Sequence, residues 1–406
     1  MKVLHLILYE QLFPPKNGGM LRCWNLLEQI SKYHEVDVIT MQNDIIVQLN
    51  KSDFKLPAST RFFIPANDGI IPGQKNISFK EKVWTAIKYR LSFQTLSNAD
   101  SSVLKIVSVL KIIKNNEYDL VIFEHLESLR LFKKIKPLFP LAKIIFDAHN
   151  VDHLLLHSNA NKRRLKNIRK AESTLYKKCD LVFTASVSDA EILRSFNKNK
   201  IQVAVIPNGI DVEKNSYQLP DFNHNPKKII FCGSLDYEPN QIGLMWFLNN
   251  VWKDIIKIYS TIILLVVGKG QPGDALMGSL KHDSNIEFIG EVDEVIPYYR
   301  NAQCAIVPLL NGSGTRLKIL EAMSLGVPVI STSIGAEGIH YKNGENIFIS
   351  NERNEYLDII DRLYKNDAIF ISISRNANEL VHNEYSWNVI GNTLKIILRE
   401  LTQILI

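Results

Sequence analysis

The stretch from Gly312 to Ser331, GSGTRLKILEAMSLGVPVIS, decides how the second half of this chain folds. Glycines open it, an apolar-periodic run follows, and Gly326 and Pro328 end that run before a short apolar segment. This order predicts a loop, a helix over Leu317–Leu325 and a strand over Val329–Ser331. Glycines let the backbone approach a ligand closely, and the first N–H groups of a helix bind anions. The stretch therefore predicts an α/β domain with a phosphate-binding loop.

Three charged side chains on the predicted helix support this interpretation. Arg316 and Lys318 lie in its first turn, where the helix dipole repels two cations unless an anion lies between them. Glu321 follows about one turn later, where a carboxylate can accept hydrogen bonds from a ribose diol. The pattern favours a phosphate ligand over a purely structural helix.

Outside this stretch, apolar β-rich runs alternate with amphipathic runs of helical length, which favours parallel sheets covered by helices. In the first half we predict strands at Lys2–Leu8, Val36–Thr40, Leu120–Phe123, Ile144–Phe146, Leu181–Thr184 and Val203–Ile206. Helices are predicted there at Met20–Tyr33, Val103–Asn115, Leu126–Lys134, Arg163–Lys178 and Ser188–Ser195. The series restarts with a strand at Lys228–Cys232, followed by helices at Gln241–Ile258 and Val295–Asn301 and strands at Thr261–Val267, Ile286–Ile289 and Ala305–Pro308.

The restart predicts the fold class and the domain boundaries. The fold class is α/β, with two Rossmann-like doubly wound domains facing each other across a cleft. Residues 1–206 form the first domain, 207–226 a linker rich in Pro and Gly, and 227–386 the second domain. The last helix, over 387–406, is expected to pack back onto the first domain.

Composition fits a soluble globular protein of two domains. The chain has 406 residues, 46% of them hydrophobic and 22% charged. Its apolar runs, such as Ile262–Val267, are too short to cross a bilayer, and Met1–Leu8 lacks the cleavage site of a signal peptide. Cys23, Cys179, Cys232 and Cys304 form no metal-binding motif and fit a reducing compartment. We expect a cytoplasmic protein.

Charge is distributed unevenly along the chain. Residues 1–205 carry a balance of +12 and residues 206–406 a balance of −6. Two basic groups lie on predicted helices or just after one: Lys133, Lys134 and Lys136, and Lys162, Arg163, Arg164, Lys166, Arg169, Lys170, Lys177 and Lys178. Such groups are usually solvated helix faces, and the alternative is peripheral attachment to anionic lipid on the inner face of the cell membrane. No nucleic-acid recognition module accompanies them, so nucleic acid is not an expected partner.

Several segments, in this order, resemble a known family over essentially the whole chain. They are Pro207–Asp211, Gly233–Asp236, Val267–Gly270, Phe288–Val292 and above all Gly312–Gly338, which includes Gly335-Ala336-Glu337-Gly338. Together they resemble the GT-B glycosyltransferases, in particular the family-4-like group of retaining enzymes, also called glycosyl transferases group 1.

The resemblance implies a donor site in the second half. Glu321 would hold the donor ribose, the loop of Gly312, Ser313, Gly314 and Thr315 the diphosphate, and Gly290 and Val292 would lie beside the base, with Gly233 in the loop after the first strand. Two departures from the family stand out. Ser313 replaces a common Glu, and Ser234 with Asn240 or Gln241 replaces a common basic pair. We expect Arg316 and Lys318 to supply the missing positive charge.

The first half supplies the other part of the expected site. Pro14-Pro15-Lys16-Asn17-Gly18-Gly19 follows the first strand and opens a helix, so Gly18 and Gly19 would lie near the donor phosphates. His149, at the end of a strand, matches a family histidine that contacts the transferred sugar, although a buried structural histidine is the alternative. Glu124 and His125 end the neighbouring strand and could line the same cleft.

The expected function is transfer of a sugar from a nucleotide-sugar donor to a glycan or lipid-linked acceptor, with retention of configuration, in surface polysaccharide or glycolipid biosynthesis. The chain lacks a metal-binding D-x-D motif, so neither a metal ion nor another cofactor is expected. Two alternatives stay open: a sugar-nucleotide epimerase of the same fold, and a non-catalytic partner that resembles glycosyltransferases.

Overall fold

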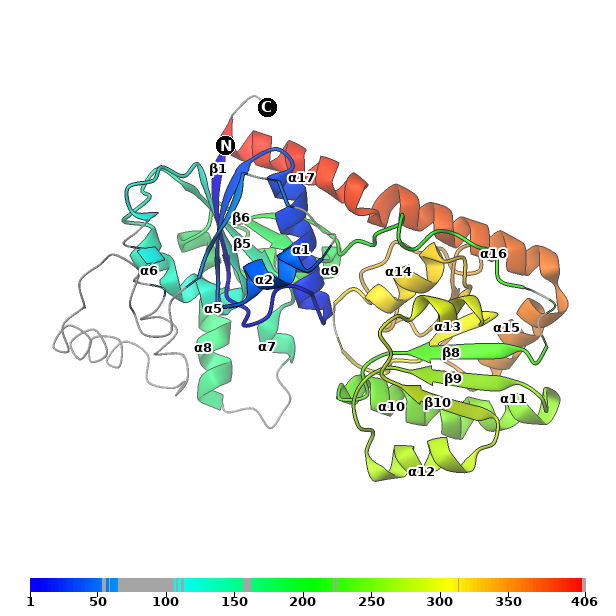
Figure 1. The fold of residues 1–406 in the computed structure, drawn as a ribbon. Helices are drawn as coiled ribbons and strands as arrows, with labels where there is room; N and C mark the ends of the chain where they lie inside the picture. Colours follow the sequence, from blue (N-terminus) through cyan, green and yellow to red (C-terminus); the bar gives the residue numbers. More distant parts are fainter. Residues whose placement is uncertain are drawn as a thin grey trace. The chain divides into compact units, whose positions relative to one another are not determined.

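The structure is a computed structural model that describes residues 1–52, 56–57, 59–64, 106, 109–110, 113–155, 162–221, 223, 225–312 and 314–403. Ser313 and most of the predicted helix Val103–Asn115 lie outside the described residues. The chain divides into two compact units (Figure 1). Unit 1 contains Met1–Thr184, Asp189–Ile206 and Gly391–Ile406, and unit 2 contains Ala185–Ser188 and Pro207–Ile390.

Unit 1 is built on a parallel sheet of seven strands in the order β3-β2-β1-β4-β5-β6-β7. The strands are β1 (Lys2–Ile7), β2 (Glu35–Thr40), β3 (Thr60–Phe63), β4 (Leu120–Glu124), β5 (Lys143–Ala148), β6 (Leu181–Thr184) and β7 (Gln202–Val205). All six predicted strands are confirmed, and β3 was not predicted. It is a four-residue edge strand with no buried residue, so it lacks the apolar run that marks the inner strands.

The helices of unit 1 connect these strands. They are α1 (Gly18–Ser31), α2 (Ile45–Asn50), α5 (His125–Ser128), α6 (Phe132–Ile135), α7 (Asp152–Leu155), α8 (Lys162–Glu172) and α9 (Val187–Phe196), whose first two residues belong to unit 2. The single helix predicted over Leu126–Lys134 is wrong in detail, because a 3₁₀ turn at Leu129–Leu131 separates α5 from α6. The sheet order reverses between β1 and β4. In open α/β sheets, ligands bind at the carboxyl ends of the strands that flank such a point.

Unit 2 repeats the plan with a parallel sheet of six strands in the order β10-β9-β8-β11-β12-β13. Its strands are β8 (Lys228–Cys232), β9 (Ile263–Val267), β10 (Ile286–Gly290), β11 (Cys304–Val307), β12 (Val329–Ser331) and β13 (Phe348–Ile349). Its helices are α10 (Glu238–Phe247), α11 (Lys253–Ile258), α12 (Asp274–His282), α13 (Ile296–Arg300), α14 (Leu317–Ser324), α15 (Arg353–Lys365) and α16 (Asp367–Leu380). The predicted helix Gln241–Ile258 is present as α10 and α11, joined by a π-helical turn at Leu248–Trp252.

The segments at the predicted boundaries have definite partners. Residues 207–226, expected as a linker, are grouped with unit 2, where Ile210 forms a bridge with Ser386 and Gln218 donates to the Leu325 carbonyl. The last helix, α17 (Trp387–Thr402), belongs to unit 1 from Gly391 onward, and Lys395 lies 4.1 Å from the ring centre of Tyr33. None of the helices within the described ranges is both long and apolar enough to span a bilayer.

Candidate active site

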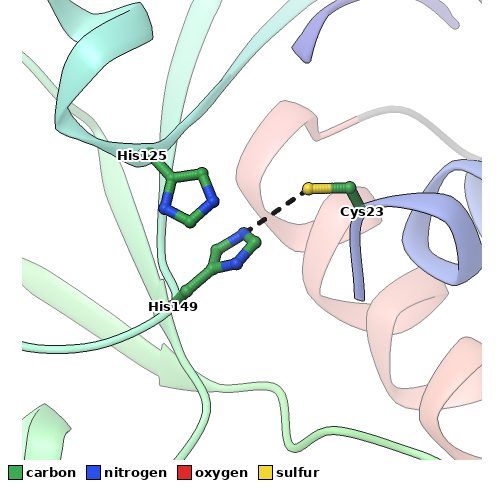
Figure 2. A group of neighbouring side chains, drawn as sticks. All are labelled: Cys23, His125 and His149. Atoms are coloured by element: carbon green, nitrogen blue, oxygen red, sulfur yellow. Dashed lines mark hydrogen bonds between the residues drawn. The ribbon is translucent and has the colours of Figure 1, made fainter. Parts of the chain in front are cut away.

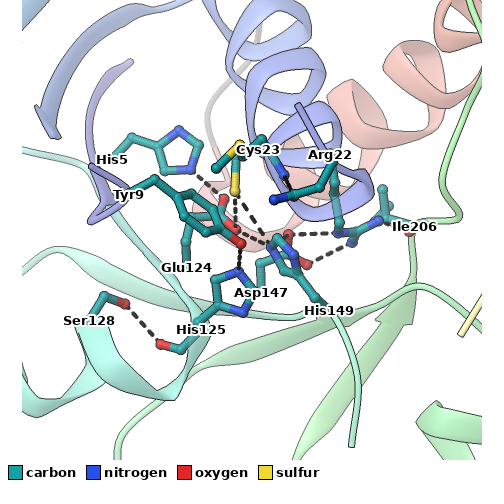
Figure 3. Close-up of polar contacts among 12 residues, drawn as sticks. His5, Tyr9, Arg22, Cys23, Glu124, His125, Ser128, Asp147, His149 and Ile206 are labelled. Carbon is teal, nitrogen blue, oxygen red and sulfur yellow. Dashed lines mark hydrogen bonds and ion pairs between the residues drawn. The ribbon is translucent and has the colours of Figure 1, made fainter. Parts of the chain in front are cut away.

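A buried cluster of polar side chains occupies the carboxyl edge of the sheet in unit 1 (Figure 3). Glu124 is the last residue of β4 and is in register with Asp147 near the end of β5, while His149 follows β5 directly. His5 lies on β1, beside β4, and α1 brings Arg22 and Cys23 over the same edge. Because parallel strands end together at one edge, residues that are far apart in the sequence meet here.

Glu124 is the centre of the cluster. Its Oε1 lies 2.5 Å from Nε2 of His5 and its Oε2 lies 2.7 Å from Nε2 of His149. The Cys23 thiol donates to Oε2 across 3.4 Å. Burial alone would raise the pKa of Glu124, but the hydrogen bonds from His149 and His5 outweigh it and hold that pKa well below its usual value. The carboxylate is therefore ionised.

Asp147 is paired with Arg22 deep in the same cluster. The guanidinium donates from Nε and Nη2 to the two carboxylate oxygens at 2.8 and 2.6 Å, and from Nη1 to the Ile206 carbonyl at 2.7 Å. Arg22 is 1% exposed and Asp147 is fully buried. Such a bidentate pair fixes both side chains. It also holds the Asp147 carboxylate, in addition to that of Glu124, near His149.

The two histidines of the cluster carry different charges. Burial would lower the pKa of His149, but Asp147 at 3.4 Å and Glu124 raise it to about 9, so the ring is an imidazolium at neutral pH. Burial and the positive charge of His149 lower the pKa of His125 to about 4, so that ring is neutral. The ring centres are 3.7 Å apart, and His125 Nε2 bonds the Tyr9 hydroxyl.

The second nitrogen of His149, Nδ1, is buried and has no hydrogen-bond partner among the described residues. Gly19 lies beside it, since a Cβ built on this glycine would be 3.4 Å from Nδ1 and 2.7 Å from the Tyr9 hydroxyl. Gly18 begins α1, and the Asn17 side chain caps this helix by accepting from the Met20 amide at 3.0 Å. The structure thus brings the predicted Gly18-Gly19 loop and His149 together.

Cys23, His125 and His149 also offer donor atoms that lie within 4.8 Å of one another (Figure 2). Their present partners argue against a metal site. His149 Nε2 is held by Glu124 and His125 Nε2 by Tyr9. Burial raises the pKa of the Cys23 thiol well above its usual value, which disfavours the thiolate that binds metals. We therefore assign no metal to this cluster.

Unit 2 holds the other predicted residues around α14. Lys318, in the first turn, donates from Nζ to Asn240 Oδ1 at 2.9 Å and lies 5.0 Å from the ring centre of Phe231. A Cβ on Gly233 would lie 2.3 Å from this Nζ, so the glycine leaves room for the ammonium group. Burial lowers the pKa of Lys318 to about 8. Asn240 lies near the position where the family commonly has a lysine. It thus contacts Lys318, the residue that we expect to replace the positive charge of that lysine.

Arg316 immediately precedes α14, beside the glycine loop, rather than lying in the first helical turn as predicted. A Cβ on Gly312, whose φ is +111°, would be 2.7 Å from Nη2 of Arg316 and 3.1 Å from the Tyr237 hydroxyl. Burial lowers the pKa of Arg316, and its hydrogen bond to Tyr237 opposes that shift. The positive φ favours glycine here, and a side chain would also displace the guanidinium.

The remaining predicted donor-site residues lie at the same end of unit 2. Glu321 is in the second turn of α14. Burial raises its pKa, and the positive charge of Lys318 opposes this rise only in part. Thr315 and Gly314 precede the helix, and a Cβ on Gly338 would be 2.8 Å from the Thr315 hydroxyl. Gly290 ends β10 with φ of +78°, and Val292, half-buried, follows it. A Cβ on Gly290 would meet no described atom within 4 Å.

Sequence reasoning did not select five members of the cluster in unit 1: His5, Tyr9, Arg22, Cys23 and Asp147. One signal was available, because His5 and Asp147 interrupt strands that are apolar after their first lysine. A buried ionisable group in such a position needs a partner. Nothing in the sequence named that partner, since Arg22 lies 125 residues before Asp147.

Comparisons with known proteins agree with this architecture. The family described as Glycosyltransferase Family 4 matches residues 17–214, and the family described as Glycosyl transferases group 1 matches residues 226–366. The chain is 25% identical over 398 residues to an uncharacterized 44.6 kDa protein in the cps region of Klebsiella pneumoniae, covering 92% of this chain and 94% of that protein.

Two further proteins are informative. The UDP-Gal:alpha-D-GlcNAc-diphosphoundecaprenol alpha-1,3-galactosyltransferase of Escherichia coli is 23% identical over 309 residues, which cover 72% of this chain and 77% of that one. The sucrose-phosphate synthase of Thermosynechococcus elongatus has a similar structure, with a TM-score of 0.73, 16% identity and 99% coverage of both chains. At this identity the structural likeness shows the fold alone.

The two parallel sheets, each covered by helices, define the GT-B class of glycosyltransferase folds. Both family matches lead to one assignment for this chain. It belongs to the family-4-like glycosyltransferases, glycosyl transferases group 1, as the order of its sequence segments predicted.

Proposed function

We propose that this glycosyltransferase is a retaining, metal-independent hexosyltransferase that uses a nucleotide-sugar donor. Unit 2 binds the donor diphosphate at the start of α14 and the donor ribose at Glu321. His149 of unit 1 contacts the transferred sugar. The acceptor is a glycan or a lipid-linked glycan in surface polysaccharide assembly.

The observation that carries the proposal is the placement of two cationic side chains, Arg316 and Lys318, at the start of α14. Burial is the main cause that lowers the pKa of Lys318. The positive charge of Arg316 lowers it further, so the two cations lie close together. Glu321 raises the Lys318 pKa, and burial raises the pKa of Glu321 itself. A bound diphosphate would neutralise both cations and the helix N-terminus.

The chemistry of the relatives supports the acceptor class. One relative lies in a cps region, and another is a galactosyltransferase whose name specifies a sugar on diphosphoundecaprenol. The exposed basic helix α8, with Lys162, Arg163, Arg164 and Lys166, suits contact with the anionic membrane in which such a lipid would lie. The protein would then work as a peripheral enzyme on the cytoplasmic membrane face.

The same charges support the proposed metal independence. In metal-dependent transfer, a divalent cation stabilises the leaving diphosphate. Here Arg316, Lys318 and the α14 N–H groups would do so by electrostatic stabilisation. Full activity in excess EDTA is the expected result, and activity that requires added Mg²⁺ or Mn²⁺ contradicts this part of the proposal.

The test of the donor site is a thermal-shift screen with UDP, GDP, ADP and their sugar conjugates in EDTA. A ligand at one hundred times its Kd adds about 2.7 kcal/mol of stability. We expect one nucleotide to stabilise the protein, and we expect Glu321→Ala to abolish that effect. Glu379→Ala, which removes an exposed carboxylate on α16, is the matched control. No stabilisation by any nucleotide would overturn the donor assignment.

The test of the reaction is the anomeric configuration of the product, read from proton coupling constants by NMR. Retention is expected, and an inverted product contradicts the retaining mechanism. Conversion of the donor sugar without any acceptor would instead identify an epimerase. Nucleotide-sugar binding without turnover, across lipid-linked and soluble acceptors, would identify a non-catalytic partner.

A further inference from the structure

The buried cluster of unit 1 contains two carboxylates and one guanidinium, so it lacks one positive charge. Glu124 is ionised, and Asp147 is bound by Arg22 through both carboxylate oxygens. Uncompensated charge in a buried site is costly, and a further cation beside Glu124 would balance it. His149 is in the right place, 2.7 Å from Glu124 and 3.4 Å from Asp147.

Glu124 is also placed to fix the orientation of His149. Each carboxylate oxygen has its own histidine partner, His5 at Oε1 and His149 at Oε2. His5 is fully buried on β1, and Glu124 ends the neighbouring strand β4. The rigid sheet therefore sets the direction of the carboxylate, and the carboxylate sets the plane of the His149 ring (Figure 3).

This arrangement determines which nitrogen of His149 faces a ligand. Nε2 is engaged by Glu124, whereas Nδ1 is buried without a partner among the described residues. An imidazolium carries a proton on both nitrogens, so Nδ1 is a charged hydrogen-bond donor. The missing side chain of Gly19 leaves space on this side, since its Cβ would stand 3.4 Å from Nδ1. A buried donor that lacks a partner indicates a position where a ligand supplies the acceptor.

We propose that Glu124, braced by His5, is a positioning residue that keeps His149 charged and points its Nδ1–H past Gly19 at an oxygen of the substrate. This inference rests on the proposed function and deepens it. The ligand atom is an electronegative oxygen of the sugar nucleotide, either a sugar hydroxyl or a phosphate oxygen. A charged donor binds either one, and it binds a phosphate oxygen more strongly as negative charge develops on the leaving group.

The charges of the other ionisable groups around His149 are consistent with a ring that is protonated on both nitrogens. They are His5 and Tyr9 from β1 and the loop after it, Arg22 and Cys23 from α1, Glu124 from β4, His125 from α5, Asp147 from β5 and Asp152 from α7. Burial raises the pKa values of Tyr9 and Cys23 and lowers that of His125, so these three are neutral. Arg22 is the one fixed cation in this set, and its charge is taken up by Asp147.

The first experiment is NMR of the full-length protein with labelled histidine and without any ligand. The His149 signal is assigned by its loss in His149→Gln. We expect the wild-type ring to carry a proton on both nitrogens at neutral pH and to lose one of them with a pKa of about 9. In Glu124→Gln the ring should lose its proton at least one pH unit lower. Glu127→Gln, which neutralises an exposed carboxylate three residues along, should leave the titration unchanged.

Two results would overturn the proposal. One is a wild-type His149 that is neutral at pH 7. The other is a folded Glu124→Gln protein whose His149 titrates as in wild type. His5→Gln gives a second variant that retains the carboxylate, and a smaller downward shift is expected because only the brace is lost. These readouts need no donor or acceptor, so they decide the proposal even if the proposed transfer reaction fails.

Kinetics separate positioning from simple stabilisation. Once a donor is known, the alkaline limb of the kcat/KM profile should move to lower pH in Glu124→Gln, with activity at pH 6 within a few-fold of wild type. A purely structural role would instead lower kcat/KM by the same factor at every pH. Such a uniform loss contradicts the positioning role.

Discussion

His149 in unit 1, which is buried, and Lys318 in unit 2, which is half-buried, are both cations, yet their pKa values shift in opposite directions. Burial disfavours the charge of each. At His149, hydrogen bonds and charges from Asp147 and Glu124 overcome burial and raise the pKa to about 9. At Lys318, burial prevails, Arg316 adds repulsion, and the pKa falls to about 8.

The difference shows that hydrogen-bonded counter-charges decide whether burial lowers the pKa of a cation or is overcome. Unit 1 has two carboxylates for Arg22 and His149, so its cluster is neutral as it stands. In unit 2, Glu337 raises the pKa of Arg316 and Glu321 raises that of Lys318, but burial outweighs both. In unit 1 the carboxylates outweigh burial without a ligand, whereas in unit 2 burial prevails, so an anion bound beside Arg316 and Lys318 would stabilise their charges.

The largest expected effect is the loss of the closed network in unit 1. Arg22→Ala leaves Asp147 buried without its partner, so we expect a loss of about 3–5 kcal/mol in the free energy of unfolding. Lys342→Ala, which removes the 73% exposed partner of Glu345, should cost about 1 kcal/mol or less. Urea unfolding followed by circular dichroism measures both. Equal losses would show that the Arg22 pair is no more important than a surface pair.

The pH dependence of stability is the next test. The folded pKa of His149, about 9, lies above the value of about 6.5 expected in the unfolded chain. Its contribution is therefore fully present below pH ~6.5 and is lost as the pH rises through 9, by about 3 kcal/mol in total. The difference in unfolding free energy between wild type and His149→Gln should shrink from pH 6 to pH 9.5. A difference that stays constant across this range contradicts the raised pKa.

Lys318 should show the opposite sign. Its folded pKa of about 8 is below the value of about 10.4 in an unfolded chain, so its charge costs stability that is regained as the pH rises from 8 to 10. Lys318→Met should leave the protein at least as stable but weaken nucleotide binding about ten- to hundredfold, because a charged hydrogen bond is lost. Isothermal titration calorimetry measures the affinity, with Lys281→Met, an exposed lysine on α12, as control. Unchanged affinity would remove Lys318 from the donor site.

The smallest expected effect concerns the third partner of Glu124. Cys23→Ala removes a thiol that donates to Oε2 across 3.4 Å, while both histidine partners remain. We expect about 1 kcal/mol of destabilisation and no change in the NMR titration of His149. A clear fall in the His149 pKa would mean that the thiol takes part in holding the charge.

Much of the fold was predictable because inner strands of parallel sheets are continuous apolar runs. Val121–Phe123 and Leu264–Val267 show this pattern, and the structure confirms strands there. The pattern was weaker at β3, which has no buried residue, and at β13, which has two residues. No prediction covered α12, α15 and α16, although α15 alternates buried and exposed positions over Arg353–Lys365.

The sequence by itself determined the class of fold, the family and the residues that end the central strands. Glu124, His149 and the Gly18-Gly19 loop could be selected from it because local order places them at the carboxyl edge of a sheet. The sequence also determined that Arg316 and Lys318 share the start of one helix, since this is a matter of spacing.

Only the tertiary structure decided which groups are partners and therefore which are charged. Glu124 meets His5 across 119 residues of sequence, and Arg22 meets Asp147 across 125. A pKa depends on burial and on charges within a few ångströms, and neither can be read from positions along the chain. The opposite shifts of His149 and Lys318 are therefore properties of the folded protein alone.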